Sequence, residues 1–155
     1  MLANFKSYAL ALGIAFTGLQ VVQPSAKTQA PARCLNSSHL ENTVGPQVGA
    51  IIERSCKDCH SNETAWPWYS HIAPVSWIIS KHVTQGRQKL NFSEWQAGKQ
   101  TANQMAEICD AVSDGSMPIR GYTVLHRDAK LSSHDVDAIC DWAATRVAHN
   151  QPPLR

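Results

Sequence analysis

The chain has 155 residues, of which 17% are charged, and its formal net charge at pH 7 is only +2. This balance, with no block of Lys or Arg, provides neither the basic footprint of a nucleic-acid-binding protein nor an acidic interaction tail. From the charge we therefore expect no nucleic-acid partner. The length suits a single domain, so we expect one core.

The N-terminus has the pattern of an export signal. Lys6 is the only early cation, the apolar run Tyr8–Val22 follows it, and Gln23–Arg33 is polar and contains proline. A cation, an apolar run and a polar segment in this order are typical of exported proteins. A buried core helix of a cytoplasmic protein is the alternative.

Whether this segment is removed depends on its length and on the residues that follow it. The run is at the upper limit for a signal peptide and slightly short for a full membrane span. Ser25 and Ala26 are small enough for a cleavage site, but Pro24 disrupts the usual pattern. We therefore predict that residues 1–22 form an uncleaved anchor rather than a removed signal, followed by a linker over residues 23–45.

A short helix is expected at the start of the folded part, residues 46–148. Pro46 suits the first turn of a helix, and the apolar residues after it keep helical spacing up to about Cys56. These apolar residues are Val48, Ile51 and Ile52. The helix would carry the next motif at its C-terminal end.

The pentapeptide Cys56-Lys57-Asp58-Cys59-His60 has the pattern of a c-type haem attachment site. Two thiols at this spacing can each add to one vinyl group of a haem, and the adjacent imidazole then becomes the proximal ligand of the iron. The sequence therefore predicts one covalent haem c, held by Cys56 and Cys59, with His60 bound to its iron.

Two other interpretations of the cysteine pair stay open. A zinc site would need a second Cys or His pair, whereas Cys34, Cys109 and Cys140 are isolated in the sequence. A thioredoxin-like redox pair would need a preceding apolar strand inside a βαβ unit, and no such strand is indicated. Haem is the interpretation that the spacing favours.

An aromatic loop and a second helix follow the pentapeptide. Trp66-Pro67-Trp68-Tyr69 places three large aromatic residues around a proline, so we predict an ordered loop that packs on haem or on the core. A second helix is predicted over Pro74–Gly86 from its helical spacing of apolar residues. That stripe comprises Val75, Ile78, Ile79, His82 and Val83.

A third helix is predicted over Ser93–Val112. Ser93 with Gln96 three residues later forms the sequence pattern of a capping box. The apolar face of this helix would contain Met105, Ile108, Cys109 and Val112.

The C-terminal part contains one more predicted helix. Gly115 ends the preceding helical region, Ser116–Lys130 is predicted as a loop, and the last helix begins at Ser132 with Asp135 as its capping partner. Its buried stripe would comprise Val136, Ile139, Cys140, Ala143 and Val147. No segment sustains the alternation of a strand, so the fold class is all-α.

Several further motifs follow one another along the chain. They are Trp66-Pro67-Trp68-Tyr69-Ser70, Ile72-Ala73-Pro74-Val75-Ser76-Trp77, His82, Gly86-Arg87, Leu90-Asn91-Phe92-Ser93-Glu94-Trp95, Met117-Pro118 with Tyr122 and His126, and Leu131-Ser132 through Trp142. Together with the pentapeptide, and over about residues 46–145, they resemble the bacterial haem-binding domain family of small cytochrome-c-like proteins. The resemblance implies covalent haem, a cytochrome-like helical fold and an N-terminal membrane anchor, and it implies no established substrate.

The second axial position of the iron distinguishes an electron carrier from a reaction centre. Met117 is the best candidate for it, because Pro118 keeps Met117 extended in a loop between two predicted helices. Met105 lies on a predicted buried stripe, where core packing is the ordinary explanation. The rival ligands are His82 and, in loop sequence, His71 and His126.

Other residues have two open interpretations each. Arg87 and the indoles of Trp66 or Trp77 are candidates for binding haem propionates, and Arg87 could equally be a surface residue. Cys109 and Cys140 could form a disulfide in an oxidising compartment or could be two small buried side chains.

These features predict a cytochrome-c-like helical domain around one covalent haem, preceded by an N-terminal hydrophobic helix. We expect a monohaem c-type cytochrome that passes electrons between redox partner proteins on the periplasmic side of the inner membrane, to which that helix anchors it. It would be a carrier rather than a catalyst. The alternatives are a peroxidase-like haem enzyme, with His82 or His126 as distal acid and base, and a haem-based gas or redox sensor.

Overall fold

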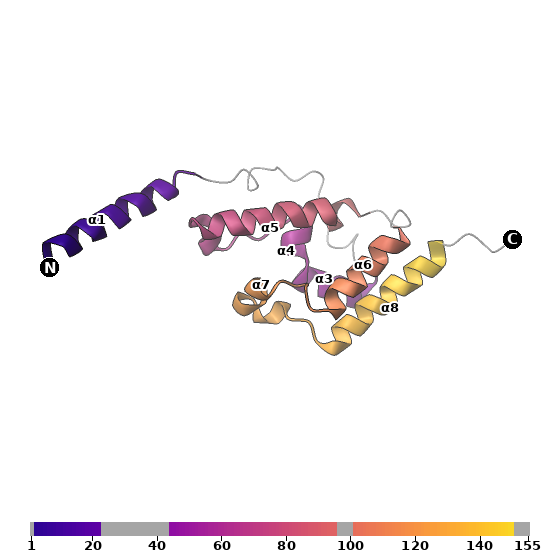
Figure 1. Cartoon of the computed structure of the whole chain (residues 1–155). Helices are drawn as coiled ribbons and strands as arrows, with labels where there is room; N and C mark the ends of the chain where they lie inside the picture. The colour runs from indigo at the N-terminus through magenta and orange to yellow at the C-terminus, as the bar shows by residue number, and fades with distance from the viewer. Residues whose placement is uncertain (1, 23–43, 96–100, 151–155) are drawn as a thin grey trace.

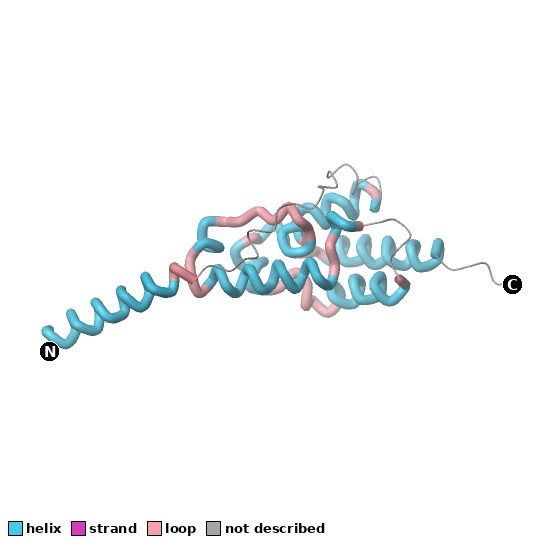
Figure 2. The backbone as a smooth tube through the Cα atoms, turned by 90° about the horizontal axis from the view of Figure 1, so that it is seen from above, coloured by secondary structure: helices cyan, strands magenta, loops and turns pink. Residues whose placement is uncertain are grey.

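The computed structural model describes residues 2–22, 44–95 and 101–150, and all regular structure in these ranges is helical, which confirms the all-α class (Figures 1 and 2). The elements in chain order are α1 (Leu2–Leu19), α3 (Pro46–Ser55), α4 (Lys57–His60), η2 (Trp68–His71), α5 (Val75–Lys89), η3 (Phe92–Glu94), α6 (Ala102–Ser113), α7 (Arg120–Leu125), η4 (Arg127–Ala129) and α8 (Ser133–Asn150).

The N-terminal helix α1 extends away from the other helices (Figure 1). Apart from Lys6 it contains no charged residue, and its large apolar side chains are exposed. Among the described residues, no helix combines the length and hydropathy needed to cross a membrane. The small residues Ser25 and Ala26 that could mark cleavage, and Cys34, lie outside the described residues.

The core lies between α3, α6 and α8. The helices α6 and α8 lie side by side, and α3 packs against α8 (Figures 1 and 2). Aromatic residues fill the space beside them: the ring of Trp95 lies 5.5 Å from those of both Phe92 and Trp142. The largest fully buried side chain is Met105, which confirms that this methionine packs in the core.

A disulfide joins α6 to α8. It connects Cys109 with Cys140, whose Cα atoms are 4.8 Å apart. Of the two interpretations left open by the sequence, the structure therefore selects the covalent one. The bond ties together two of the three helices that surround the core.

Two helix starts are confirmed, and each depends on residues next to one another in the sequence. Gly45 has a φ of 89°, a conformation that suits glycine, and Pro46 follows it in the first turn of α3. At α8 the Ser132 hydroxyl accepts a bond from the Asp135 amide, and the Asp135 carboxylate accepts one from the Ser132 amide. These reciprocal bonds satisfy two backbone donors that the first helical turn leaves unpaired.

The predicted start of the third helix at Ser93 is wrong. Residues 92–94 form the short helix η3, and α6 begins at Ala102 behind a capping box made by Thr101 and Gln104. The reason is that the Ser93 hydroxyl accepts a bond from the Asn62 amide, 2.9 Å away, and so does not cap a following helix. Likewise, the predicted loop Ser116–Lys130 contains the short helices α7 and η4.

The predicted apolar stripe of the second helix is only partly buried. In α5 the buried face consists of Ser76, Ser80 and Val83, whereas Val75 and Ile78 are exposed. This face packs against η2, where Ser70 is also fully buried. Small side chains let two backbone segments approach closely. The search for an apolar stripe could not find this face, because serine is not an apolar residue.

Candidate functional site

The pentapeptide forms a single turn directly after α3. The Cys56 carbonyl accepts bonds from the amides of Cys59 and His60, at 3.2 and 3.0 Å, so both cysteines and the histidine lie on one compact turn. Neither thiol is in a disulfide, and both cysteines are half-buried. This turn therefore presents two available thiols and an imidazole together, which is the set that covalent haem requires.

Gly86 allows α5 to cross this turn at backbone contact. A Cβ atom at Gly86 would lie 2.6 Å from the Cys59 carbonyl oxygen and 3.2 Å from its carbon. Both atoms belong to the backbone, so neither can rotate away. The closeness of α5 to α4 is thus set by the absence of a side chain at Gly86.

The His60 ring is oriented by a backbone acceptor. Its Nδ1 lies 3.1 Å from the Leu90 carbonyl oxygen, and since a carbonyl can only accept, Nδ1 carries the proton and Nε2 has a free lone pair. Burial lowers the pKa of His60, only partly opposed by backbone hydrogen bonds to Leu90 and Gly86. A neutral imidazole, held through Nδ1 with Nε2 available, is the form that binds iron.

Both thiols of the turn are held protonated. Burial, with the nearby Cys59, raises the pKa of Cys56 to about 12, and burial with the charge of Asp58 raises that of Cys59 to about 11. A thioredoxin-like pair works through a thiolate whose pKa is lowered. The environment is therefore opposite to the one that a dithiol redox site requires.

Arg87 clamps the segment that follows the turn. Its Nε donates to the Ser61 carbonyl at 2.7 Å, and its Nη2 donates to the Thr64 hydroxyl at 2.8 Å. Burial lowers the pKa of Arg87, opposed by the neighbouring Cys59. The sequence left Arg87 open as a partner of a haem propionate or as a surface residue, and the structure gives it these protein partners beside the motif.

A hydrogen-bonded aromatic cluster lies against the same turn, and its role was not foreseen. Tyr122 of α7 donates to the Asp58 carboxylate at 2.8 Å, and its ring stacks on His126 at 4.3 Å. Nε2 of His126 in turn lies 2.6 Å from the Tyr69 hydroxyl. Asp58, located between the two cysteines, thereby connects α7 to the turn of residues 56–60, which we call the attachment turn.

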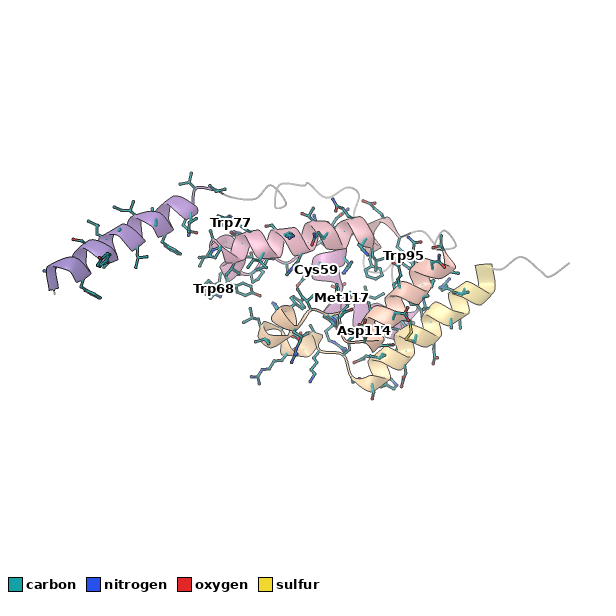
Figure 3. All side chains as sticks on the ribbon, in the orientation of Figure 1. Cys59, Trp68, Trp77, Trp95, Asp114 and Met117 are labelled. Atoms are coloured by element: carbon teal, nitrogen blue, oxygen red, sulfur yellow. A yellow bond between two sulfur atoms is a disulfide. The ribbon has the colours of Figure 1, made fainter. Side chains whose placement is uncertain are left out.

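Met117 lies in the loop between α6 and α7. Its side chain is 40% exposed, and its amide donates to the Ala111 carbonyl at 2.9 Å. Figure 3 labels Met117 in this loop and Cys59 in α4. The Tyr122–Asp58 bond independently ties the segment that follows Met117 to α4.

The remaining predicted residues are spread over the fold. Trp77 donates its indole N–H to the Val22 carbonyl, at the far end of α5. Trp66 and His82 are half-buried, and His71 is exposed on η2. The described residues contain no group of three or more His, Cys, Asp or Glu side chains arranged to hold a metal ion.

In a comparison with protein families, the family model described as "Haem-binding domain" matches residues 14–145. No curated protein and no solved structure matches the chain.

Proposed function

The chain belongs to the haem-binding domain family, and from that premise we propose that it is a monohaem c-type cytochrome. It would pass electrons one at a time between redox partner proteins on the periplasmic side of the inner membrane. The observation that carries the proposal is the attachment turn, with two unpaired thiols and a histidine whose Nδ1 donates to the Leu90 carbonyl.

Each residue of this turn has a separate task. Cys56 and Cys59 would hold the porphyrin through thioether bonds, and His60 would bind the iron through Nε2. When bound, the haem supplies one-electron redox chemistry at its iron. The Leu90 carbonyl keeps the proton of His60 on Nδ1 and fixes the plane of the ring.

We propose that Met117 would hold the iron together with His60. Its sulfur belongs to a half-exposed side chain rather than to the core, unlike that of Met105. A thioether in this position would saturate the iron and raise its reduction potential relative to a second histidine. Saturation by two protein ligands is what an electron carrier needs, because no coordination site remains for a substrate.

The contacts around the turn support a rigid site. Gly86 meets the Cys59 backbone, Arg87 holds Ser61 and Thr64, and Tyr122 holds Asp58. Two elements from distant parts of the sequence, α5 and α7, thus restrain one turn. Restraint of this kind keeps the rearrangement that accompanies electron transfer small.

Export and anchoring are part of the proposal. The disulfide between Cys109 and Cys140 is typical of oxidising compartments, as is covalent haem attachment. The apolar helix α1 is the candidate for membrane attachment through residues 1–22. Mass spectrometry of the protein isolated from membranes tests both points, because it reports retention of the N-terminus and the addition of one haem.

Absorption spectra of the purified protein, oxidised and reduced, with and without carbon monoxide, test the axial ligands. We expect the weak far-red band of thioether-ligated ferric haem and no response to carbon monoxide. Met117→Ala should abolish that band, whereas Met105→Leu, which keeps the core filled, should retain it. Colourless protein whose Cys56 and Cys59 both react with an alkylating reagent would refute the proposal as a whole.

One observation favours a second candidate, reduction of a small oxidant such as peroxide. His126 pairs with Tyr69 and stacks on Tyr122 next to the attachment turn, which is an arrangement able to donate a proton. This activity requires an open coordination site. A high-spin spectrum that shifts with carbon monoxide, and a peroxide-dependent turnover lost in His126→Ala, would select it over the carrier.

A further inference from the structure

Two segments of the chain carry no Asp, Glu, Lys or Arg. One is residues 7–22, which includes most of α1, and the other is residues 64–80, which includes η2 and the first part of α5. They are separated by more than forty positions in the sequence. The structure brings their ends together.

Three hydrogen bonds form the junction between these two segments. The Gln20 side-chain carbonyl accepts from the Ala73 amide at 2.9 Å, and its NH₂ donates to the Ala73 carbonyl at 3.3 Å. Trp77 donates its indole N–H to the Val22 carbonyl at 2.8 Å. The residues that follow α1 thus bond both backbone groups of Ala73, which is fully buried, and the Trp77 side chain in the first turn of α5.

Large apolar side chains are exposed at this same end of the domain. Trp68 is 76% exposed and Ile78 is 54% exposed, whereas Trp95 and Trp142 of the core are 5% and 8% exposed. Ile72 and Val75, which lie between Trp68 and Ile78 in the sequence, are also exposed. Figure 3 shows Trp68 and Trp77 at the end of α5 that points toward α1. We name Trp68, Ile72, Val75 and Ile78 the apolar end.

We propose that the apolar end is a second membrane contact, which rests on the lipid surface that α1 enters. A lipid surface is the occupant because the apolar end continues directly into α1, whose apolar side chains are exposed along its length. The absence of charge over both segments, together with tryptophan at their junction, matches the interface between lipid and water. This inference rests on the N-terminal attachment and is independent of haem.

The proposed contact fixes the distance of the redox site from the lipid. The attachment turn meets α5 at Gly86, while the apolar end surrounds the first turn of the same helix. Eleven helical positions between Val75 and Gly86 correspond to roughly 16 Å. The site would therefore be held above the membrane surface at one height rather than at the end of a loose tether.

Hydrogen exchange of the full-length haem protein, with and without phosphatidylcholine vesicles, tests the contact. Lipid should protect the amides of residues 66–78 as well as those of α1, and should leave those of α7 unchanged. A zwitterionic lipid is chosen because the proposed surface is uncharged, so added salt should not weaken binding.

Variants separate this contact from binding by α1 alone. Trp68→Ser, Ile72→Ser and Val75→Ser combined should weaken partition into the vesicles by roughly 30-fold and remove the protection of residues 66–78. The matched control is Val124→Ser with Leu125→Ser, which replaces two exposed apolar residues of α7 and should change partition less than about twofold. Unchanged haem spectra verify that both variants are folded.

Three results would overturn the inference. The first is unprotected residues 66–78 in the presence of vesicles that do protect α1. The second is protection that grows with protein concentration in the absence of lipid, which would identify a second copy as the occupant. The third is the absence of residues 1–22 from protein isolated from membranes. All three leave the haem spectra, and hence the proposed haem chemistry, unaffected. The third would also remove the anchoring through residues 1–22 that the proposed function includes.

Discussion

The core between α3, α6 and α8 and the attachment turn under α5 are held by different forces. In the core, apolar and aromatic side chains fill the space between long helices, and a disulfide joins two of them. At the turn, a glycine meets a backbone carbonyl, and polar side chains bond to backbone groups and to Asp58.

This difference has a physical reason. Apolar packing tolerates small shifts between helices, whereas a cofactor site needs groups fixed to within a fraction of an ångström. Backbone contact and charged hydrogen bonds supply that fixity because they are short and directional. The core therefore determines how much stability the domain has, and the contacts at the turn determine how accurately His60 is placed.

The largest effect on stability should come from the disulfide of the core. Replacing Cys109 and Cys140 together by Ala should lower the free energy of unfolding by about 4 kcal/mol, because the bond closes a loop of 31 positions. Urea unfolding of the haem protein measures this. The haem spectrum in the absence of urea should not change, and a changed spectrum would contradict the separation of the two regions.

Gly86→Ala should change the haem site as well as the stability, unlike the loss of the disulfide. Its Cβ would overlap the Cys59 backbone, so α5 must move away from the turn, at a cost of about 3 kcal/mol. Covalent haem incorporation, measured by mass spectrometry, should fall, and the remaining haem should have an altered spectrum. Gly121→Ala is the control, since a Cβ there meets no atom within 4 Å, and it should behave like the parent protein.

Tyr122→Phe tests the bond between α7 and the turn. The hydroxyl donates to a carboxylate, so its loss should cost about 2 kcal/mol and leave Asp58 without that donor. Tyr69→Phe removes a bond to the imidazole of His126 instead and should cost about half as much. Thermal unfolding of both variants checks the order, and equal losses would show that the carboxylate confers no special strength.

Ser76→Ala should stabilise the protein. The Ser76 hydroxyl is fully buried and has no hydrogen-bond partner among the described residues, so its small size rather than its polarity suits the contact with η2. Removing an unsatisfied hydroxyl should raise the free energy of unfolding by about 1 kcal/mol. Ser76→Val should lower it through crowding, and a gain in that variant would refute the close packing inferred for this face.

The sequence predicted the parts of the fold that depend on neighbouring residues. The starts of α3 and α8 follow from Pro46 and from the Ser132–Asp135 pair, each within four positions. The start of the third helix was wrong because Ser93 is used by Asn62, thirty-one positions away. The short helix α7 was missed because six residues are too few to show a clear periodicity, and its apolar residues Val124 and Leu125 are both exposed.

The candidate site divides in the same way. The attachment turn is a local motif, and its spacing can be read directly from Cys56, Cys59 and His60. The contacts that orient it join residues far apart: Leu90 to His60, Gly86 to Cys59, and Tyr122 to Asp58. No periodicity or capping pattern encodes such pairs, so the sequence could name the cofactor without describing how its ligand is held.

The smallest expected effect concerns the pH dependence of the core helix α8. Backbone hydrogen bonding from Ser132, together with Arg54 at 3.0 Å, lowers the pKa of Asp135 below its usual range, although burial opposes this. A carboxylate whose pKa is lowered by folding stabilises the folded state above its unfolded pKa, and this contribution disappears as the pH falls through the folded value. Asp135→Asn should therefore cost less than about 1 kcal/mol at pH 7 and nothing at a pH below the folded pKa of Asp135. Urea unfolding across the acidic range measures the difference between variant and parent. A difference that stayed constant with pH would show that the cap acts through its geometry alone, without its charge.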